Sequence, residues 1–160
     1  HDRGCPFYLL VRPDDPKPPS NSCGQKLSSQ QQGKGPGVYF EKEDGQWQYV
    51  RCDENHGVAI AFYCLDRVNE NLQMVLGGFN GSSTRLLARL LREQGYDLFW
   101  PPKYTSAELA IGISIVKFGL KPTKSKKLLA KPEERWESTE VDEVPHEAIA
   151  RRIEGEREGS

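Results

Sequence analysis

Short apolar runs, separated by turn-forming residues, recur along the first 120 residues and predict strands there. The run from Phe7 to Val11 is almost entirely apolar and ends before a proline, as expected of a buried strand. Two further runs extend from Val58 to Leu65 and from Leu72 to Leu76, with a polar turn between them. From Leu109 to Val116, large aliphatic side chains alternate with small residues, which favours a strand with a close neighbour on its small side.

A β-hairpin is predicted between the first strand and the run that begins at Val58. Two apolar and aromatic segments, from Val38 to Phe40 and from Trp47 to Val50, flank a polar stretch that contains Asp44-Gly45. An Asp-Gly pair between two such segments is a strong signal for a tight hairpin turn. Because side chains alternate along a strand, Trp47 and Tyr49 should share one face of the hairpin.

The segment from Ser83 to Gln94 has the period of an amphipathic helix. Its leucines fall on one face and its arginines on the other, and Gly95 is placed to end it. The aromatic run from Tyr96 to Trp100 follows and indicates a strand. Strand, helix and strand with short connections predict a right-handed, Rossmann-like parallel βαβ unit from Leu72 to Trp100. The expected fold class is therefore α/β, a mixed sheet with this unit and an N-terminal hairpin.

Polar segments divide the chain further. Residues 13–36 are rich in Pro, Ser, Gln, Gly and Lys, and we expect a long flexible loop there. Charge dominates residues 121–160, which we expect to be a charged tail or peripheral helix attached to an α/β domain of residues 1–120. The piece from Val144 to Glu154 has Ile149 and Ile153 one helical turn apart, as in a short helix.

Composition excludes some classes of function. Hydrophobic residues make up 36% of the 160 residues, and no apolar run reaches the length of a membrane helix. The net charge of −1 gives no electrostatic reason to expect nucleic acid or anionic lipid as a partner of this segment. The four cysteines, Cys5, Cys23, Cys52 and Cys64, include no C-x-x-C pair, and we expect reduced thiols in the cytoplasm.

The glycine-rich turn before the predicted helix carries the main candidate for ligand binding. Glycines there would admit an anionic group, and hydroxyls and backbone N–H groups at the helix N-terminus would hold it. The spacing is neither G-x-G-x-x-G, nor a P-loop, nor a nucleophile elbow. The alternative is that a serine caps the helix and the glycines only turn the chain. The candidate ligand-binding residues of this turn are Gly77, Gly78, Asn80, Gly81, Ser82, Ser83 and Thr84.

Two aromatic residues complete the candidate site. Trp100 and Tyr104 follow the second strand of the expected βαβ unit, and ligands of open α/β sheets bind at the carboxyl ends of strands. These rings could form a wall of the site or pack into the core. His56 lies in a loop with Cys52, but the spacing matches no zinc signature, so no metal site is expected. No third group in the sequence is positioned to orient His56 for acid–base work.

These features favour a non-catalytic module that binds or senses a small, anionic molecule. The chain opens on His1, and its first residues resemble a linker, so we expect it to be excised from a larger, regulatory protein. One alternative is an enzyme acting on a nucleotide or phosphorylated substrate with His56 or Asp97 as acid or base. Another is a protein-interaction module whose charged tail orders on a partner. The sequence indicates no cofactor and no oligomeric state.

Overall fold

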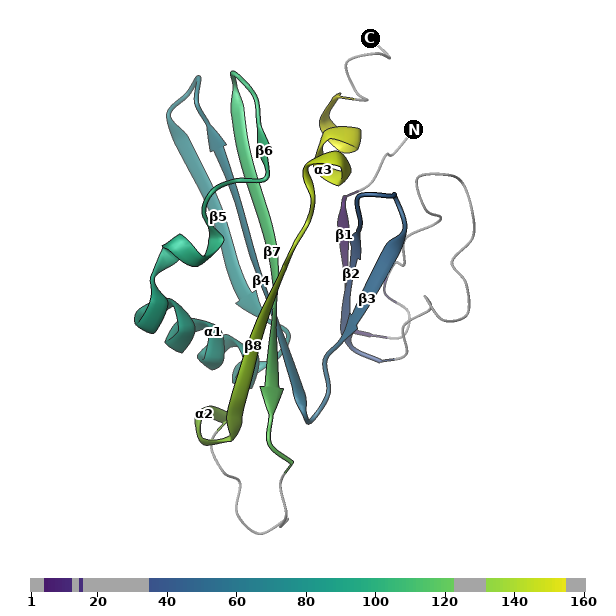
Figure 1. Ribbon diagram of the computed structural model, residues 1–160, viewed down its shortest axis with the longest axis vertical. Coiled ribbons are helices and arrows are strands. Elements are labelled where there is room, and N and C mark those ends of the chain that lie inside the picture. The colour runs from purple at the N-terminus through teal and green to yellow at the C-terminus, as the bar shows by residue number, and fades with distance from the viewer. Residues whose placement is uncertain (1–4, 13–14, 16–34, 123–131, 155–160) are drawn as a thin grey trace.

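The computed structural model describes residues 5–12, 15, 35–122 and 132–154, which form two antiparallel sheets with helices around them (Figure 1). The smaller sheet has the strand order β1-β2-β3, and the larger sheet has the order β5-β4-β7-β6, with β8 pairing the later part of β7. The strands are β1 (Phe7–Leu10), β2 (Gly37–Glu41), β3 (Trp47–Arg51), β4 (His56–Asp66), β5 (Asn71–Gly78), β6 (Tyr104–Thr105), β7 (Leu109–Leu120) and β8 (Trp136–Glu143).

Helices cover both faces of the larger sheet. The longest, α1, lies on one face, whereas the smaller sheet and α3 lie on the other, as Figure 1 shows. The helical elements are α1 (Gly81–Gln94), the 3-10 turn η1 (Tyr96–Phe99), α2 (Pro132–Arg135) and α3 (His146–Ile153).

Alternation along β4 divides its side chains between two cores. Val58 and Ile60 face the smaller sheet and α3, where they join one hydrophobic cluster. Ala59, Ala61 and Tyr63 face α1 and its buried leucines in a second cluster. Because successive side chains point to opposite faces of a strand, one strand supplies both cores. The small alanines let α1 approach the sheet closely.

The predicted helix is confirmed, and it begins two residues earlier than expected. The Asn80 side chain caps it by accepting a hydrogen bond of 2.8 Å from the Ser83 N–H. At the other end Gly95 has a φ of +76°, which glycine adopts without strain, and its N–H donates to the Leu91 carbonyl at 2.8 Å.

The predicted hairpin is also confirmed. β2 and β3 pair in antiparallel register, with Val38 opposite Val50 and Tyr39 opposite Tyr49. At the turn the Lys42 N–H donates to the Gln46 carbonyl at 2.8 Å, and Gly45 has a φ of +78°. Because a left-handed backbone suits glycine, the Asp44-Gly45 pair fixes this turn. Trp47 and Tyr49 share one face, as expected.

The predicted Rossmann-like βαβ unit from Leu72 to Trp100 is wrong. β5 is antiparallel to β4, and every strand pair between described residues is antiparallel. The aromatic run that indicated a second strand is η1, whose Phe99 is buried in the core beneath α1. Gly95 changes the direction of the chain after α1. The backbone of the aromatic run therefore pairs with no neighbouring strand. The protein is therefore mostly antiparallel β, not α/β.

The C-terminal segment contributes to both the sheet and the core. Within residues 121–160, expected to be a charged tail or peripheral helix, β8 pairs with β7 and α3 packs against the larger sheet. Val144, Ala148 and Ile149 are buried there. The loop expected at residues 13–36 lies mostly outside the described residues, as do Cys23 and residues 123–131.

Candidate functional site

The residues of the predicted glycine-rich turn lie together at the junction of β5 and α1. Gly77 and Gly78 end β5, Asn80 caps α1, and Gly81 begins it. The Val58 N–H of β4 donates to Ser83 Oγ at 3.1 Å, and the Gly78 N–H donates to Thr84 Oγ1 at 3.2 Å. These two hydroxyls therefore hold the helix on the sheet.

Gly78 is needed for this close approach. A Cβ atom at Gly78 would lie 2.3 Å from the backbone nitrogen of Thr84. Ser83 is fully buried, whereas Gly81 is exposed and a Cβ there would meet nothing within 4 Å. Anion binding at this turn stays a prediction, with Asn80, Gly81 and Thr84 as its exposed members and Ser82 half-buried.

Trp100 and Tyr104 lie on opposite faces of the larger sheet. Trp100 is exposed and stacks on Tyr63, with ring centroids 5.9 Å apart, on the face that α1 covers. Tyr104 is buried in the core on the other face and stacks on His146 at 5.4 Å. The two rings therefore form no common wall beside the glycine-rich turn.

A groove of about 750 Å³ lies between β3 and the ends of β4, β7 and β8. We call it the β3–β8 groove. The smaller sheet covers only part of the face of β4 and β7, so the polar ends of these strands line an open hollow. The lining residues are 48–51, Asp53, 55–58, 117–120, Pro122, Glu137, Ser138 and Glu140.

Asp53 organises the turn at one end of the groove, which we call the Asp53 turn (residues 52–56). Its Oδ1 accepts a hydrogen bond of 2.9 Å from the Asn55 N–H, and the same atom lies 2.8 Å from His56 Nδ1. Because a carboxylate only accepts, Nδ1 carries the hydrogen and donates. Nε2 of His56 is then the ring nitrogen left for a ligand. Arg51 Nε completes the set at 3.5 Å from Asp53 Oδ2.

These contacts shift the acidity of Asp53. Partial burial acts to raise its pKa, but the Asn55 N–H, the His56 ring and the Arg51 guanidinium together outweigh burial. The pKa of Asp53 therefore lies below its usual value. The carboxylate is ionised at neutral pH and keeps the turn in one conformation.

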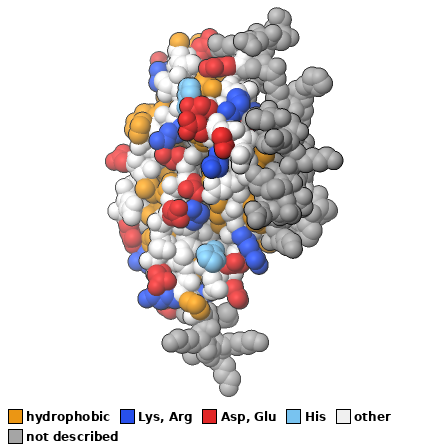
Figure 2. Space-filling model, turned by 45° about the vertical axis from the view of Figure 1, so that its right-hand side comes forward, with side chains coloured by type: hydrophobic (Ala, Val, Ile, Leu, Met, Phe, Trp, Pro, Cys, Tyr) orange, Lys and Arg blue, Asp and Glu red, His pale blue; other side chains and the backbone are white. Residues whose placement is uncertain are grey.

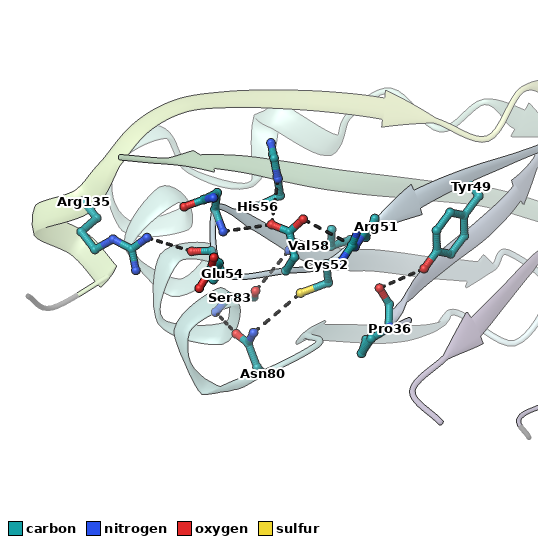
Figure 3. A network of polar contacts seen from close by, with 12 residues as sticks. Pro36, Tyr49, Arg51, Cys52, Glu54, His56, Val58, Asn80, Ser83 and Arg135 are labelled. Atoms are coloured by element: carbon teal, nitrogen blue, oxygen red, sulfur yellow. Dashed lines mark hydrogen bonds and ion pairs between the residues drawn. The ribbon is translucent and has the colours of Figure 1, made fainter. Parts of the chain in front are cut away.

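Arg135 of α2 ties the Asp53 turn to the far end of β7. Its Nη2 donates to the Glu54 carbonyl and its Nε to the Lys121 carbonyl, each at 2.8 Å. The Leu120 N–H donates to the Asn55 carbonyl at 2.9 Å. Figure 3 shows Arg135 reaching the turn from one side and Arg51 from the other. These hydrogen bonds thus connect the groove wall to α2 and to the end of β7.

Glycine forms the floor of the groove between two polar side chains. His56 of β4, Gly119 of β7 and Ser138 of β8 lie side by side across three strands. A Cβ at Gly119 would lie 2.3 Å from Ser138 Oγ, so this position accepts no side chain without displacing the serine. The Ser138 hydroxyl therefore fills the space above Gly119, and a ligand in the groove would meet the side chains of Ser138 and His56.

The charges along the groove are mixed and largely paired. Lys117 Nζ lies 2.7 Å from Glu140 Oε1 and 2.9 Å from Asp142 Oδ2. Burial acts to lower the pKa of Lys117, but these two carboxylates outweigh it and the pKa is raised. Figure 2 shows red and blue side chains interspersed on the visible face, with no field of one sign. A strongly anionic ligand gains no net attraction here.

Cys52 lies in the same turn but is buried away from the groove. Its Sγ accepts a contact of 3.6 Å from Asn80 Nδ2, which links the Asp53 turn to the cap of α1. Burial raises the pKa of the Cys52 thiol, so it is protonated at neutral pH and is a poor nucleophile. Among the described residues, no group of three metal-ligating side chains comes together.

The chain has no match among protein-family models, curated proteins or solved structures. Within the described part, none of the helices combines the length and the apolar character that crossing a bilayer requires.

The expectation that no group is positioned to orient His56 is wrong, because Asp53 Oδ1 lies 2.8 Å from its Nδ1. The other residues of the groove were not predicted from the sequence. Asp53 lies three residues before His56, and this spacing in a short turn was the one local signal that could have paired them. Lys117 and Ser138 come from distant strands. Only the pairing of β7 with both β4 and β8 brings these residues together.

Proposed function

We propose that this chain is a non-catalytic module that binds a small polar molecule in the β3–β8 groove. The observation that carries the proposal is the groove itself, whose volume of about 750 Å³ falls in the range of small-molecule sites. The Asp53 turn supports it because its hydrogen bonds hold the groove wall in place, which lowers the entropic cost of binding.

The charges favour a neutral or zwitterionic ligand. Arg51 and Lys117 are each paired with a carboxylate, and Glu137 adds another acidic group to the lining. His56 and Ser138 offer groups that both donate and accept hydrogen bonds. Such a lining suits a compact molecule with several hydroxyl, amide or amino groups. An anionic ligand at the turn from Gly77 to Thr84 is the competing proposal.

A non-catalytic role is supported by what surrounds His56. Asp53 orients the ring as a catalytic carboxylate would, but among the described residues no serine or cysteine donates a hydrogen bond to it. The cytoplasm remains the proposed compartment, supported by the free thiols of Cys5, Cys52 and Cys64.

Backbone-amide NMR of the ¹⁵N-labelled chain tests the proposal with three probes, namely glucose, glutamine and inorganic phosphate. We expect saturable shifts of the Asn55, His56, Gly119 and Ser138 amides with glucose or glutamine at millimolar concentration, and smaller shifts there with phosphate. Removing the imidazole in His56→Ala should weaken binding about tenfold, or ~1.4 kcal/mol.

The matched control is His146→Ala, because His146 stacks on Tyr104 outside the groove. That variant should bind the probes as the unaltered chain does. Phosphate shifting the Gly81–Thr84 amides, with the groove unmoved, would favour the competing turn. No saturable shift with any probe, or chemical conversion of a probe, would refute the proposal.

A further inference from the structure

β5 lies at one end of the larger sheet and pairs only with β4. Within the described residues, no strand lies on its outer side. The opposite end of the same sheet carries β6 and β8, and no residue of β5 lines the β3–β8 groove.

The hydrogen-bond pattern shows which backbone groups of β5 face outward. The Phe79 N–H, just beyond the strand, donates to the Val58 carbonyl of β4 at 3.0 Å. Residues of an antiparallel strand alternate between facing the neighbour and facing away. Gly78 therefore faces away, in agreement with its hydrogen bond to Thr84. By the same alternation Leu72, Met74 and Leu76 direct their N–H and C=O groups outward.

The side chains of β5 do not protect this edge. The strand contains no charged residue and no proline, and its register with β4 has no shift. Leu72, Met74 and Val75 are 56%, 42% and 57% exposed. Edge strands that remain unpaired normally carry lysine, proline or a bulge. β8 does carry such protection, since four of its eight residues are acidic.

An apolar hollow adjoins the edge on the face that α1 covers. Leu72 and Met74 lie beside Tyr63, Tyr96 and Trp100, which help to line a cleft of about 180 Å³. Tyr96 and Trp100 are 61% and 57% exposed. We call Leu72, Met74, Tyr96 and Trp100 the edge patch. Exposed aromatic and aliphatic side chains gathered beside unpaired backbone groups are characteristic of an interaction surface.

We propose that β5 pairs in antiparallel orientation with β5 of a second copy of this chain. A two-fold axis perpendicular to the sheet would join two larger sheets into one and place both edge patches on the same face. An uncharged edge meets its own copy without like-charge repulsion, whereas the acidic β8 would repel its own copy. This inference is independent of the proposed ligand groove.

The available surface limits the strength of the dimer. A fully buried aromatic side chain contributes about 150–250 Å². Since the side chains of the edge patch and Val75 are each about half exposed, together they offer roughly 400 Å² of surface per copy. A standard stable interface buries about 800 Å² per partner. We therefore expect a reversible dimer with a dissociation constant of roughly 10–100 µM.

Sedimentation velocity of the full chain between about 5 and 500 µM tests this inference. We expect a monomer–dimer equilibrium that Met74→Lys weakens at least tenfold, because it adds a positive charge to the paired edge of each copy. The matched control is Thr139→Lys on β8, because Thr139 is exposed and lies away from β5. This variant should dimerise as the unaltered chain does. A monomer at every concentration, an open-ended assembly, or a dimer unaffected by Met74→Lys would overturn the inference.

A second measurement does not depend on any variant. Hydrogen exchange of the unaltered chain at about 10 and 500 µM should show concentration-dependent protection of the Leu72, Met74 and Leu76 amides. Gln73 and Val75 face β4, so their amides should be protected alike at both concentrations. If the amides of Leu72, Met74 and Leu76 gain no protection at 500 µM, β5 is not the interface. This outcome does not depend on whether the β3–β8 groove binds a ligand.

Discussion

Asp53 is the residue on which the candidate groove most depends. One carboxylate accepts a hydrogen bond from the Asn55 N–H, orients the ring of His56 and pairs with Arg51. Each contact favours the ionised form, and together they outweigh the cost of partial burial. The charge of this single side chain thus fixes both the shape of the turn and the direction of the imidazole.

Replacing Asp53 with asparagine should therefore give a pH-dependent loss of stability. The folded pKa lies below the ordinary value of 3.8, so the carboxylate stabilises the fold above about pH 4 and this contribution is lost as pH falls through the folded pKa. We expect Asp53→Asn to lower the free energy of unfolding by about 1 kcal/mol at pH 7 and by progressively less below pH 4.

Urea unfolding at pH 7 and at pH 2 measures how the free energy of unfolding differs between Asp53→Asn and the unaltered chain. Asp97→Asn is the matched control, because among the described residues no hydrogen bond or ion pair involves the Asp97 carboxylate. Its effect should stay within about 0.5 kcal/mol at either pH. A deficit of Asp53→Asn that is the same at pH 7 and pH 2 would contradict the assigned role of the charge.

At the scale of elements, the junction of β5 and α1 depends on one glycine of a pair. We expect Gly78→Ala to destabilise the fold by about 1–3 kcal/mol, because its Cβ would lie 2.3 Å from the backbone of Thr84 and the helix must shift. Gly77→Ala is the matched control, since its Cβ would meet nothing within 4 Å. Urea midpoints compare the two variants, and equal midpoints would show that the helix does not approach as closely as described.

Elements with a clear period or a decisive turn could be predicted from sequence. Asp44-Gly45 fixed the hairpin, and the leucines of α1 fixed a helix face. The run from Tyr96 to Trp100 was wrongly predicted as a strand, because aromatic residues are common both in strands and in hydrophobic cores. The packing of Phe99 beneath α1, which the sequence does not reveal, makes this run a turn. β8 has two large apolar residues, Trp136 and Val141, so no alternating pattern marks it.

The groove could be predicted less well than the elements that carry it. Its walls come from the hairpin, the Asp53 turn, the end of β7 and β8, which are far apart in sequence. Long-range pairing of β7 assembles them, and a single sequence carries no local signal of that pairing. The glycine-rich turn drew attention because it resembles a phosphate-binding turn, yet Ser83 and Thr84 hold the helix on the sheet.

At the scale of the whole molecule, the C-terminal segment closes the core between the sheets. Ile149 of α3 is buried against the larger sheet. Glu41 of β2 is fully buried, with Arg151 Nε at 3.1 Å from Oε1 and Arg152 Nη2 at 2.6 Å from Oε2. Removing both arginines would leave a buried carboxylate without a cation, which is strongly destabilising.

A chain that ends at residue 120 should therefore fail to fold cooperatively. It lacks β8, which is one of the partners of β7, and it lacks Val144 and α3, whose Ala148 and Ile149 help to fill the core between the sheets. We expect a loss of more than about 5 kcal/mol, comparable to the whole stability of many domains. Thermal melting followed by circular dichroism measures this, with the full chain as reference. A cooperative transition within a few degrees of the full chain would show that residues 1–120 form a domain by themselves.

The division of β4 between two cores leaves its pairing no freedom to slide. Ala59 and Ala61 leave room for the leucines of α1, whereas Val58 and Ile60 fill the space opposite Phe40 and Val50. A slip of one position would send the branched side chains under the helix and the methyl groups into the wider gap, overfilling one side and emptying the other. Because small and bulky residues alternate along β4, only one register of this strand fits both cores.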